Sequence, residues 1–245
     1  MLTSIIIPTY NGLPLLQSCI QAIQQHTSEP YEIIVVDNGS KDGTNEYCRS
    51  MGFTFASLAV NKGFPIACNI GLRMAAGDQL LLLNNDVIVS KDWLKNLLAG
   101  LYSGNDVGLI GPTSNRVSGR QQIRLNYQGL DGYPDAAARY MSSHEGVRLE
   151  VKRLVGFCLL FRRKVMEDIG LLDERFTPGH YEDDDYCYRA RLRGYRLLIA
   201  RDCYVHHLGS ASFKRRKRMA LRRLIANNRR KFIRKWGVHP GQFHR

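Results

Sequence analysis

The sequence predicts an α/β protein, a mostly parallel β-sheet flanked by helices and followed by a basic C-terminal helix. Over the first hundred residues, short apolar runs typical of buried strands alternate with amphipathic helical patterns. The connections between successive runs are long enough to hold a helix, as the βαβ units of a parallel sheet require. After position 212 the chain has 13 Lys or Arg residues and no acidic residue.

The first part of the chain supplies four predicted strands and four predicted helices. Each strand is a run of β-branched, leucine or aromatic residues, and each helix repeats its apolar residues at helical intervals. Ser90 precedes the fourth helix and is expected to be its N-cap, because its hydroxyl can accept a hydrogen bond from the first turn. The strands are expected at 3–8, 31–37, 53–58 and 78–84, and the helices at 13–23, 42–51, 63–77 and 90–101.

Residues 114–150 are rich in Gly, Ser, Asn and Pro and show little periodicity, which predicts a long loop with a short helix near 135–142. A connection of this length inside a compact domain is typical of a lid or a binding loop. An apolar strand at 153–163 follows. The chain then has an acid-rich helix start and a further strand that ends in His206 and His207.

The charge of the chain is concentrated in its tail. The formal charge is +13, from 35 Lys and Arg against 22 Asp and Glu, and the basic tail accounts for all of the excess. Apolar residues at helical intervals predict that 213–245 is a basic amphipathic helical extension that packs one face on the domain. Contact of 213–235 with an anionic membrane, or with an acidic acceptor, stays open. Nucleic acid is not favoured, because aromatic residues for base stacking are sparse there.

The six cysteines are spaced singly, with no C-x-x-C pair, so reduced buried thiols are expected rather than a zinc or redox site. No apolar run approaches the roughly 20 residues that span a bilayer. The N-terminus lacks the basic and small-residue features of a signal peptide. The expected location is therefore the cytoplasm, with peripheral contact at the inner membrane face left open.

Small polar residues follow three of the predicted strands. Thr9, Tyr10 and Asn11 follow the first strand, Asp37 ends the second, and 84–86 (Asn-Asn-Asp) follows the strand at 78–84. Parallel strands bring their carboxyl ends to one edge of a sheet, where ligands bind in a crevice. The sequence has no G-x-G-x-x-G after the first strand and no Walker A lysine, so neither a dinucleotide site nor a P-loop is supported.

Seven motifs in this order resemble family 2 glycosyltransferases over roughly residues 3–212. They read SIIIPTYNG, VVDNGSKDGT, NKGFPIACNIGL, LLLLNNDV, GFCLLFRR, YEDDDYCYRARLRGYR and VHHLGS. The resemblance implies the GT-A fold and inverting transfer of a sugar from a nucleoside diphosphate sugar to a hydroxyl group, assisted by a divalent metal. It also implies a nucleotide-binding half at 1–113, an acceptor-binding half at 114–212, and together a GT-A domain at 1–212.

The resemblance assigns roles to particular residues. Asp183 is the implied general base, Glu182 is implied to contact the acceptor or the sugar, and Asp185 is expected to pair with an arginine. Asp86 and His207 are the implied metal ligands, with His206 as the alternative imidazole. Because side chains alternate along a strand, only one of the two histidines is expected to face the metal. The implied nucleotide-binding residues are Thr9, Tyr10, Asn11, Asp37, Asn61, Gly63, Asn84 and Asn85.

The chemistry of the reaction explains these residue types. Charge grows on the diphosphate as the glycosidic bond breaks, and a divalent cation can stabilise it. Mn²⁺ and Mg²⁺ both accept oxygen ligands such as the Asp86 carboxylate. Many relatives have Asp where Asn84 stands, so a weak metal site completed by the nucleotide is expected. Asp37 could equally form an Asx-turn within the DNGS segment.

The sequence therefore predicts a metal-assisted inverting glycosyltransferase for a hexosyl or deoxyhexosyl group. It leaves open the base of the donor (UDP, dTDP or GDP), the acceptor (a glycan, a lipid-linked sugar or a protein) and the oligomeric state. One alternative is a GT-A-like nucleotidyltransferase, which the missing glycine-rich, Lys/Arg-bearing phosphate loop disfavours. The other is a catalytically silent binding protein that uses its basic tail.

Overall fold

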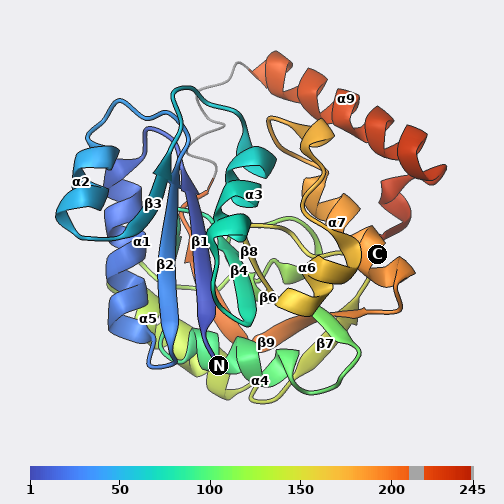
Figure 1. Cartoon of the computed structure of the whole chain (residues 1–245). Coiled ribbons are helices and arrows are strands. Elements are labelled where there is room, and N and C mark those ends of the chain that lie inside the picture. Colours follow the sequence, from blue (N-terminus) through green and yellow to red (C-terminus); the bar gives the residue numbers. More distant parts are fainter. Residues whose placement is uncertain (210–217, 244–245) are drawn as a thin grey trace.

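The computed structural model describes residues 1–209 and 218–243 (Figure 1). In chain order the strands are β1 Thr3–Thr9, β2 Tyr31–Asp37, β3 Thr54–Ser57, β4 Gln79–Leu83, β5 Val87–Ile88, β6 Val107–Ser114, β7 Arg148–Val151, β8 Cys158–Arg162 and β9 Arg196–His207. The α-helices are α1 Leu13–His26, α2 Thr44–Ser50, α3 Phe64–Met74, α4 Trp93–Leu101, α5 Tyr133–Ser142, α6 Arg163–Ile169, α7 Glu182–Leu192 and α9 Arg218–Trp236. Short 3₁₀ turns lie at Gly119–Gln121, Glu174–Phe176 and Pro240–Phe243.

Within the described residues the strands form one nine-stranded sheet in the order β3-β2-β1-β4-β8-β6-β9-β5, with β7 added beside β9. Strands β3, β2, β1 and β4 are all parallel, as the βαβ pattern of the sequence predicts. Beyond β4 the sheet is mixed, because β8 is antiparallel to both β4 and β6, whereas β6 and β9 are parallel. The polar residues that follow β1, β2 and β4 therefore lie at one edge of the sheet.

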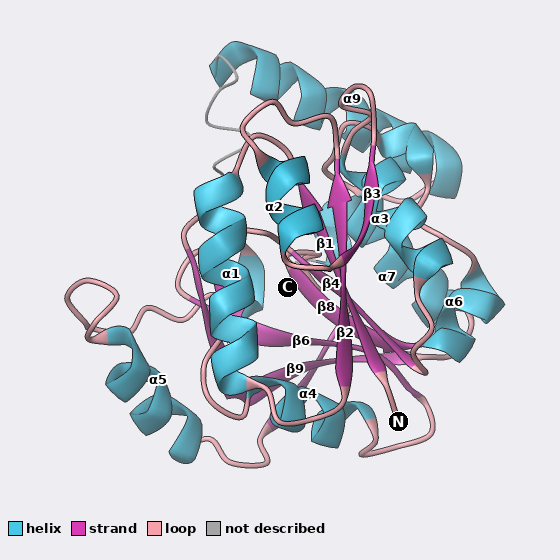
Figure 2. Ribbon diagram, turned by 60° about the vertical axis from the view of Figure 1, so that its left-hand side comes forward, coloured by secondary structure: helices cyan, strands magenta, loops and turns pink. Residues whose placement is uncertain are grey.

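Helices cover both faces of the sheet (Figure 2). Ile5 and Ile7 of β1 pack on the side of α1 and α4, whereas Ile6 between them packs on the side of α3 and α7. Alternation along a fully buried strand explains why β1 shows an unbroken apolar run. The residues of both predicted halves contribute to both apolar clusters, so one sheet and its core extend from the N-terminus through β9.

Several elements differ from the sequence prediction. Ser90 is not a helix cap, because its hydroxyl donates to the carbonyl of Tyr204 at 2.7 Å and α4 begins three residues later, at Trp93. The segment 114–150 holds the predicted short helix as α5, but it also holds β7 at its end. Strands β5 and β6 and helix α6 were not predicted, because β5 and α6 are short and β6 is rich in Gly, Pro and Ser.

The basic tail forms the predicted helix from Arg218 onward, and α9 lies beside α7 (Figure 1). Residues 213–217 and 244–245 of the predicted extension lie outside the described residues. Phe232 is completely buried, with its ring 6.0 Å from that of Tyr188 in α7. The helix therefore packs one face on the domain.

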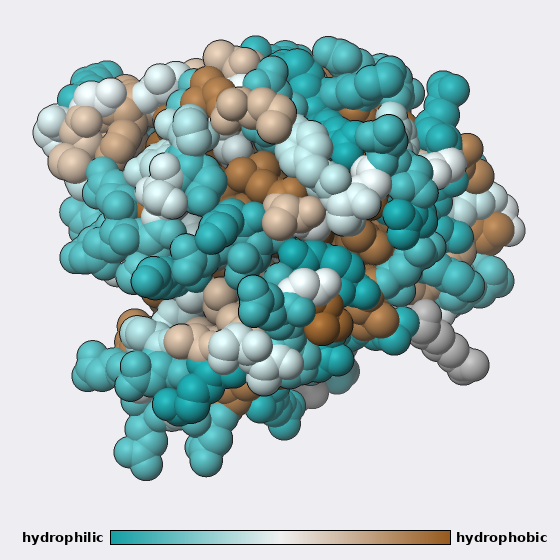
Figure 3. Space-filling view, turned by 90° about the horizontal axis from the view of Figure 1, so that it is seen from below, coloured by the Kyte–Doolittle hydropathy of each residue, from teal (hydrophilic) through white to brown (hydrophobic). Residues whose placement is uncertain are grey.

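The surface seen from below is mainly hydrophilic, with small and separate hydrophobic areas (Figure 3). Among the described residues, no helix has the combination of length and apolar character needed to cross a bilayer.

Candidate active site

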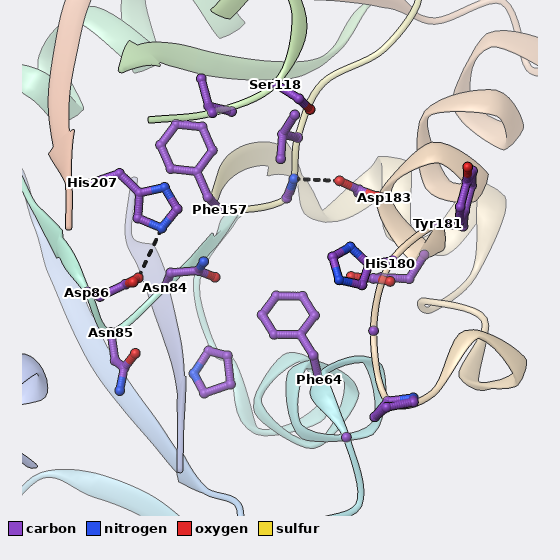
Figure 4. Close-up of a pocket in the computed structure, with 18 of the residues that line it drawn as sticks. Phe64, Asn84, Asn85, Asp86, Ser118, Phe157, His180, Tyr181, Asp183 and His207 are labelled. Atoms are coloured by element: carbon purple, nitrogen blue, oxygen red, sulfur yellow. Dashed lines mark hydrogen bonds and ion pairs between the residues drawn. The ribbon is translucent and has the colours of Figure 1, made fainter. Parts of the chain in front are cut away.

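A cavity of about 980 Å³ opens at the carboxyl ends of the parallel strands (Figure 4). Its walls come from segments that are far apart in sequence, which include the ends of β1, β2, β4 and β9, the segment before α3, the segment after β6, the segment before β8 and the loop that enters α7. Asp86 and His207 lie on one side of the cavity, and Asp183 lies across it (Figure 4). The structure thus brings the implied metal ligands and the implied base to one space.

Asp86 and His207 face each other, with 3.1 Å between Asp86 Oδ1 and His207 Nε2. Both lie where β5 pairs with β9, and the amide of Leu208 donates to the carbonyl of Asp86 at 3.0 Å. The other nitrogen of the ring, His207 Nδ1, is 2.7 Å from the carbonyl oxygen of Arg116. A carbonyl can only accept, so Nδ1 carries a hydrogen, and Nε2 is the ring nitrogen that faces the Asp86 carboxylate.

Two electron-pair donors at this distance require a proton or a metal cation to hold them together. Adjacent ligands of an octahedral cation, each about 2.1 Å from it, lie about 3.0 Å apart, which matches the observed pair. The ring of Phe157 stacks on His207, with centroids 5.2 Å apart and planes 17° apart, and fixes the ring orientation further. The donor set therefore fits a divalent cation.

His206 points to the other face of β9, as alternation predicts. Its Nδ1 is hydrogen-bonded to the hydroxyl of Tyr127, and its ring lies 5.5 Å from that of Tyr133. Burial lowers the pKa of His206, and the neighbouring His207 and Arg116 act in the same direction. His206 is therefore uncharged near pH 7, and it lies outside the cavity that Asp86 and His207 line.

The residues after β1 and β4 form one wall of the cavity. Asn85 is buried, and its amide donates to Thr9 Oγ1 at 2.8 Å, which ties the two strand ends together. Asn84 also lines the cavity, and its backbone amide donates to the carbonyl of Phe157 at 2.8 Å. Tyr10 lines the same wall. These residues are placed to contact a ligand from the side of the parallel strands.

Asn61 and Gly63 line the cavity as expected, and they are held there by Asn38, which the sequence analysis missed. The Asn38 amide donates to Asn61 Oδ1 and to the carbonyl of Gly63, each at 3.2 Å, while Asn38 Oδ1 accepts from the amide of Lys62 at 2.8 Å. Gly63 has φ +95°, and a β-carbon there would lie 2.8 Å from Pro178 Cα. Only glycine fits this close approach without strain. The signal for Asn38 was its place directly after Asp37 in a polar strand end.

Asp37 and Asn11 are not among the residues that line the cavity. Asp37 is completely buried, and its carboxylate accepts from the Ser40 amide at 3.0 Å and from the Ser57 hydroxyl at 3.2 Å. Asn11 Oδ1 accepts from the amide of Lys41 at 2.8 Å. The Asp37 carboxylate thus bonds a local backbone amide, three residues on rather than the two of an Asx-turn, and a contact of either residue with a nucleotide stays a prediction.

The general-base candidate is held rigidly at the start of α7. Asp183 accepts hydrogen bonds from the amides of Gly156 at 3.0 Å and Asp184 at 2.9 Å. Burial and the Asp184 carboxylate raise the pKa of Asp183, against the opposing effect of the Arg153 guanidinium 4.0 Å away. Arg153 itself donates to Asp184 Oδ1 at 2.7 Å. Arg153 is a second residue that the sequence analysis missed, since nothing local marks its contact with acids 30 residues later.

Glu182 is the most strongly perturbed acid of this group. Burial, together with the Asp183 carboxylate, raises the pKa of Glu182 well above its ordinary value. Its Oε2 atom is buried and has no hydrogen-bond partner among the described residues. Glu182 therefore contributes to the cavity wall a carboxyl group that favours its protonated form.

Asp185 faces away from the cavity and pairs with an arginine, as expected. Its Oδ2 accepts from Arg189 Nε at 2.8 Å, and its Oδ1 accepts from Lys235 at 2.6 Å and Trp236 Nε1 at 2.8 Å. The acid-rich start of α7 is therefore divided between the cavity and an anchor for α9.

A cavity at the edge of a parallel sheet has an acid and a histidine on one side and an acid-rich helix on the other. This is the arrangement of a GT-A glycosyltransferase. The chain belongs to glycosyl transferase family 2, whose family model matches residues 4–170.

Curated relatives and solved structures agree with this assignment. Glycosyltransferase AglE of Haloferax volcanii is 30% identical over 212 residues, covering 81% of this chain and 64% of AglE. The low-salt glycan biosynthesis hexosyltransferase Agl10 of the same organism is 26% identical over 77% of this chain and 61% of its own length. The chain therefore spans less than two thirds of either relative.

Two solved structures share the fold. The mannosyltransferase PcManGT from Pyrobaculum calidifontis, in complex with GDP-Man and Mn²⁺, matches with a TM-score of 0.68 and 21% identity, over 99% of this chain and 66% of its own. GalNAc-T7 with UDP, GalNAc and Mn²⁺ matches with a TM-score of 0.67 and 18% identity, over 84% of this chain and 44% of its own. These neighbours confirm the predicted GT-A fold.

Proposed function

We propose that this chain transfers a sugar from a nucleoside diphosphate sugar to a hydroxyl acceptor, with inversion and with the help of Mn²⁺ or Mg²⁺. One observation carries the proposal: a single cavity is lined by the Asp86–His207 pair on one side and by Glu182 and Asp183 on the other. Inverting transfer needs these two functions on opposite sides of the sugar, because the acceptor attacks from the side away from the leaving group.

The donor binds on the side of the parallel strands. Asp86 and His207 would hold the cation, which stabilises the charge that develops on the departing diphosphate. No group of three or more His, Cys, Asp or Glu side chains suited to a metal occurs in the described part of the chain. The remaining ligands would therefore be diphosphate oxygens and water, so that tight metal binding requires the nucleotide. Thr9, Tyr10, Asn84 and Asn85 supply neutral hydrogen-bonding groups on the same wall.

The acceptor presents its attacking hydroxyl group on the side of α7. Asp183 takes the proton from the acceptor hydroxyl as its oxygen attacks the sugar, and its raised pKa makes it a better proton acceptor than an exposed aspartate. Glu182, held in its neutral form by burial, donates a hydrogen bond to the sugar or the acceptor. Asp184 and Arg153 act through Asp183 by setting its charge environment.

The names of the relatives and the ligands of the solved structures indicate the class of sugar that is transferred. Agl10 is named as a hexosyltransferase, PcManGT was solved with GDP-Man, and GalNAc-T7 with UDP. We propose a hexose or deoxyhexose as the transferred unit and a glycan, lipid-linked sugar or protein as the acceptor class. Part of the proposal is that the protein acts in the cytoplasm, with the basic 213–235 segment in contact with the anionic inner membrane face.

A thermal-shift screen of UDP, GDP and dTDP, each with and without Mn²⁺, tests the donor side. The proposal predicts that one diphosphate together with Mn²⁺ stabilises the protein far more than either ligand alone. The corresponding nucleotide sugars are then assayed for release of the free diphosphate. If no combination of nucleotide and metal changes the melting temperature, the donor assignment is wrong.

A further inference from the structure

A second cavity, of about 620 Å³, adjoins the catalytic one. It is formed mainly by the segment that follows β6, with His206 of β9 at its inner wall. Arg116 and Gln122 line both cavities, so the two spaces share a wall. A molecule that occupies the second cavity can therefore extend a group toward the catalytic one.

The two cavities differ in their ionisable residues. The first cavity is lined by four acids, at positions 86, 182, 183 and 184, and by Arg116 and Arg153. The second cavity is lined by Arg116 and Arg124, and none of its nine described lining residues is acidic. A binding site with two arginines and no acid favours an anion, because guanidinium groups form strong, charge-assisted hydrogen bonds to carboxylate and phosphate oxygens.

Arg116 is exposed to solvent, and one backbone contact holds its side chain beside the cavity. Its guanidinium donates to the carbonyl of Leu208 at 2.7 Å. Gly209 has φ +86°, and a β-carbon there would lie only 2.0 Å from Arg116 Cδ, so the glycine makes room for this side chain. The carbonyl of Arg116 also orients His207, which links this wall of the second cavity to the proposed metal ligand.

Part of the lining of the second cavity is aromatic. The Tyr127 and His206 rings lie 5.7 Å apart at 62° and are joined by a hydrogen bond, with Tyr133 behind them at 5.8 Å from Tyr127. Asn115 and Gln122 add amide groups to the same cavity. Aromatic surface next to a few converging polar groups is the composition expected for a site that packs against the apolar face of a sugar ring.

We propose that the second cavity is the acceptor subsite and that it takes an anionic sugar unit, a pyranose with a carboxylate or a phosphate group. This inference rests on the proposed function and names its acceptor class. Arg116 and Arg124 bind the charged group, Tyr127 packs against the ring, and the attacking hydroxyl passes the shared wall toward Asp183.

Ligand-observed NMR titrations test the proposal with two matched pairs of probes. Methyl β-D-glucuronide is compared with methyl β-D-glucoside, and glucose 6-phosphate with glucose. The charged member of at least one pair should bind roughly tenfold more tightly than its neutral partner, as one charge-assisted contact provides. A preference for the carboxylate probe alone identifies a uronate acceptor, and a preference for the phosphate probe alone identifies a phosphorylated one.

Arg124→Gln should remove this preference and leave the neutral sugar unaffected. Arg139→Gln is the matched control, because Arg139 is exposed on α5 and lines neither cavity. Equal binding of charged and neutral probes, an equal loss in both variants, or inorganic phosphate binding as tightly as glucose 6-phosphate would overturn the inference.

Stabilisation of the same wild-type sample by a nucleoside diphosphate and Mn²⁺ is measured alongside. If that stabilisation is present, only the acceptor assignment fails, and if it is absent, the proposed function fails.

Discussion

Charge and burial around Asp183 set the conditions under which it can act as a base. The carboxylate is buried between Asp184, which disfavours its ionised form, and Arg153, which favours it. Burial raises the pKa of the neighbouring Glu182 well above its ordinary value. Burial and like charges thus favour the protonated form of both acids, and the proposal assigns the base role to Asp183 and the hydrogen-bond donor role to Glu182.

The pH dependence of transfer should report this environment. Asp183 must be ionised to accept a proton, and its pKa is raised, so kcat/KM should fall as the pH is lowered through that raised pKa, above the range of an ordinary aspartate. Asp184→Asn removes a like charge and should move the acidic limb to lower pH, whereas Arg153→Gln removes a cation and should move it to higher pH. Shifts in the same direction for both variants would contradict the assignment of Asp183.

The two adjacent histidines provide a second test at the level of single residues. His207→Ala removes one of two proposed protein ligands and should weaken the Mn²⁺-dependent binding of the nucleoside diphosphate by about tenfold or more. His206→Ala should leave this binding nearly unchanged, because its ring lies on the other face of β9. Isothermal titration with and without Mn²⁺ measures both. A loss that is equal in the two variants would remove His207 from the proposed metal site.

At the level of elements, α9 holds the loop that leads into α7. Asn228 is completely buried, and its amide donates to the carbonyls of Phe176, Gly179 and His180 at 2.7, 2.9 and 3.1 Å. Gly179 and His180 line the catalytic cavity directly before Glu182 and Asp183. The basic extension is therefore part of the structure that positions the proposed base.

Asn228→Ala should be destabilising, because it removes the buried side-chain donor that three carbonyls of this loop share. We expect a loss of about 2 kcal/mol in the free energy of unfolding, measured by urea denaturation. Transfer should fall more than nucleotide binding does, since the affected loop lies on the acceptor side. The exposed neighbour Asn227 provides the control, and Asn227→Ala should change stability by less than about 0.5 kcal/mol. Equal effects of the two substitutions would show that Asn228 does not hold the loop.

Some of the elements and contacts can be predicted from the sequence, and others cannot. Buried parallel strands such as β1 and β4 can be predicted from their continuous apolar runs. The polar residues that follow these strands indicated the edge of the sheet at which the cavity lies. Ser90 is a residue type that can cap a helix, but its hydroxyl donates a hydrogen bond to the carbonyl of Tyr204, more than 100 residues away in sequence. Arg153 and Asn228 could not be recognised, because their partners are distant in sequence and only the folded chain brings them together.

At the scale of the whole molecule, the positive charge is separated from a neutral body. In the described part of α9 six cations are exposed to solvent, and no residue of the helix is acidic; the six are Arg222, Arg223, Arg229, Arg230, Lys231 and Arg234. The opposite side of the helix packs on the domain through Asn228 and Phe232. The outward face is thus suited to an anionic surface without any rearrangement of the fold.

The full chain should therefore sediment with vesicles that contain phosphatidylglycerol and not with vesicles of phosphatidylcholine alone. Each basic residue near an anionic surface adds about 1 kcal/mol, and the binding should weaken steeply with added salt. Replacing Arg222, Arg223 and Arg230 by Gln should release the protein, while Arg139→Gln should not. Sedimentation that is independent of lipid charge would exclude this surface as a membrane contact.

The most direct test of the whole account measures nucleotide binding and sugar transfer in two variants, once the donor is known. Asp183→Asn should abolish transfer, by about a thousandfold or more, while the Mn²⁺-dependent affinity for the nucleoside diphosphate stays within about twofold of the wild type. Asp86→Ala should lose both transfer and the metal-dependent part of the affinity. An Asp183→Asn protein that still transfers sugar, or that loses its nucleotide affinity, would contradict the division of this cavity into a donor side and an acceptor side.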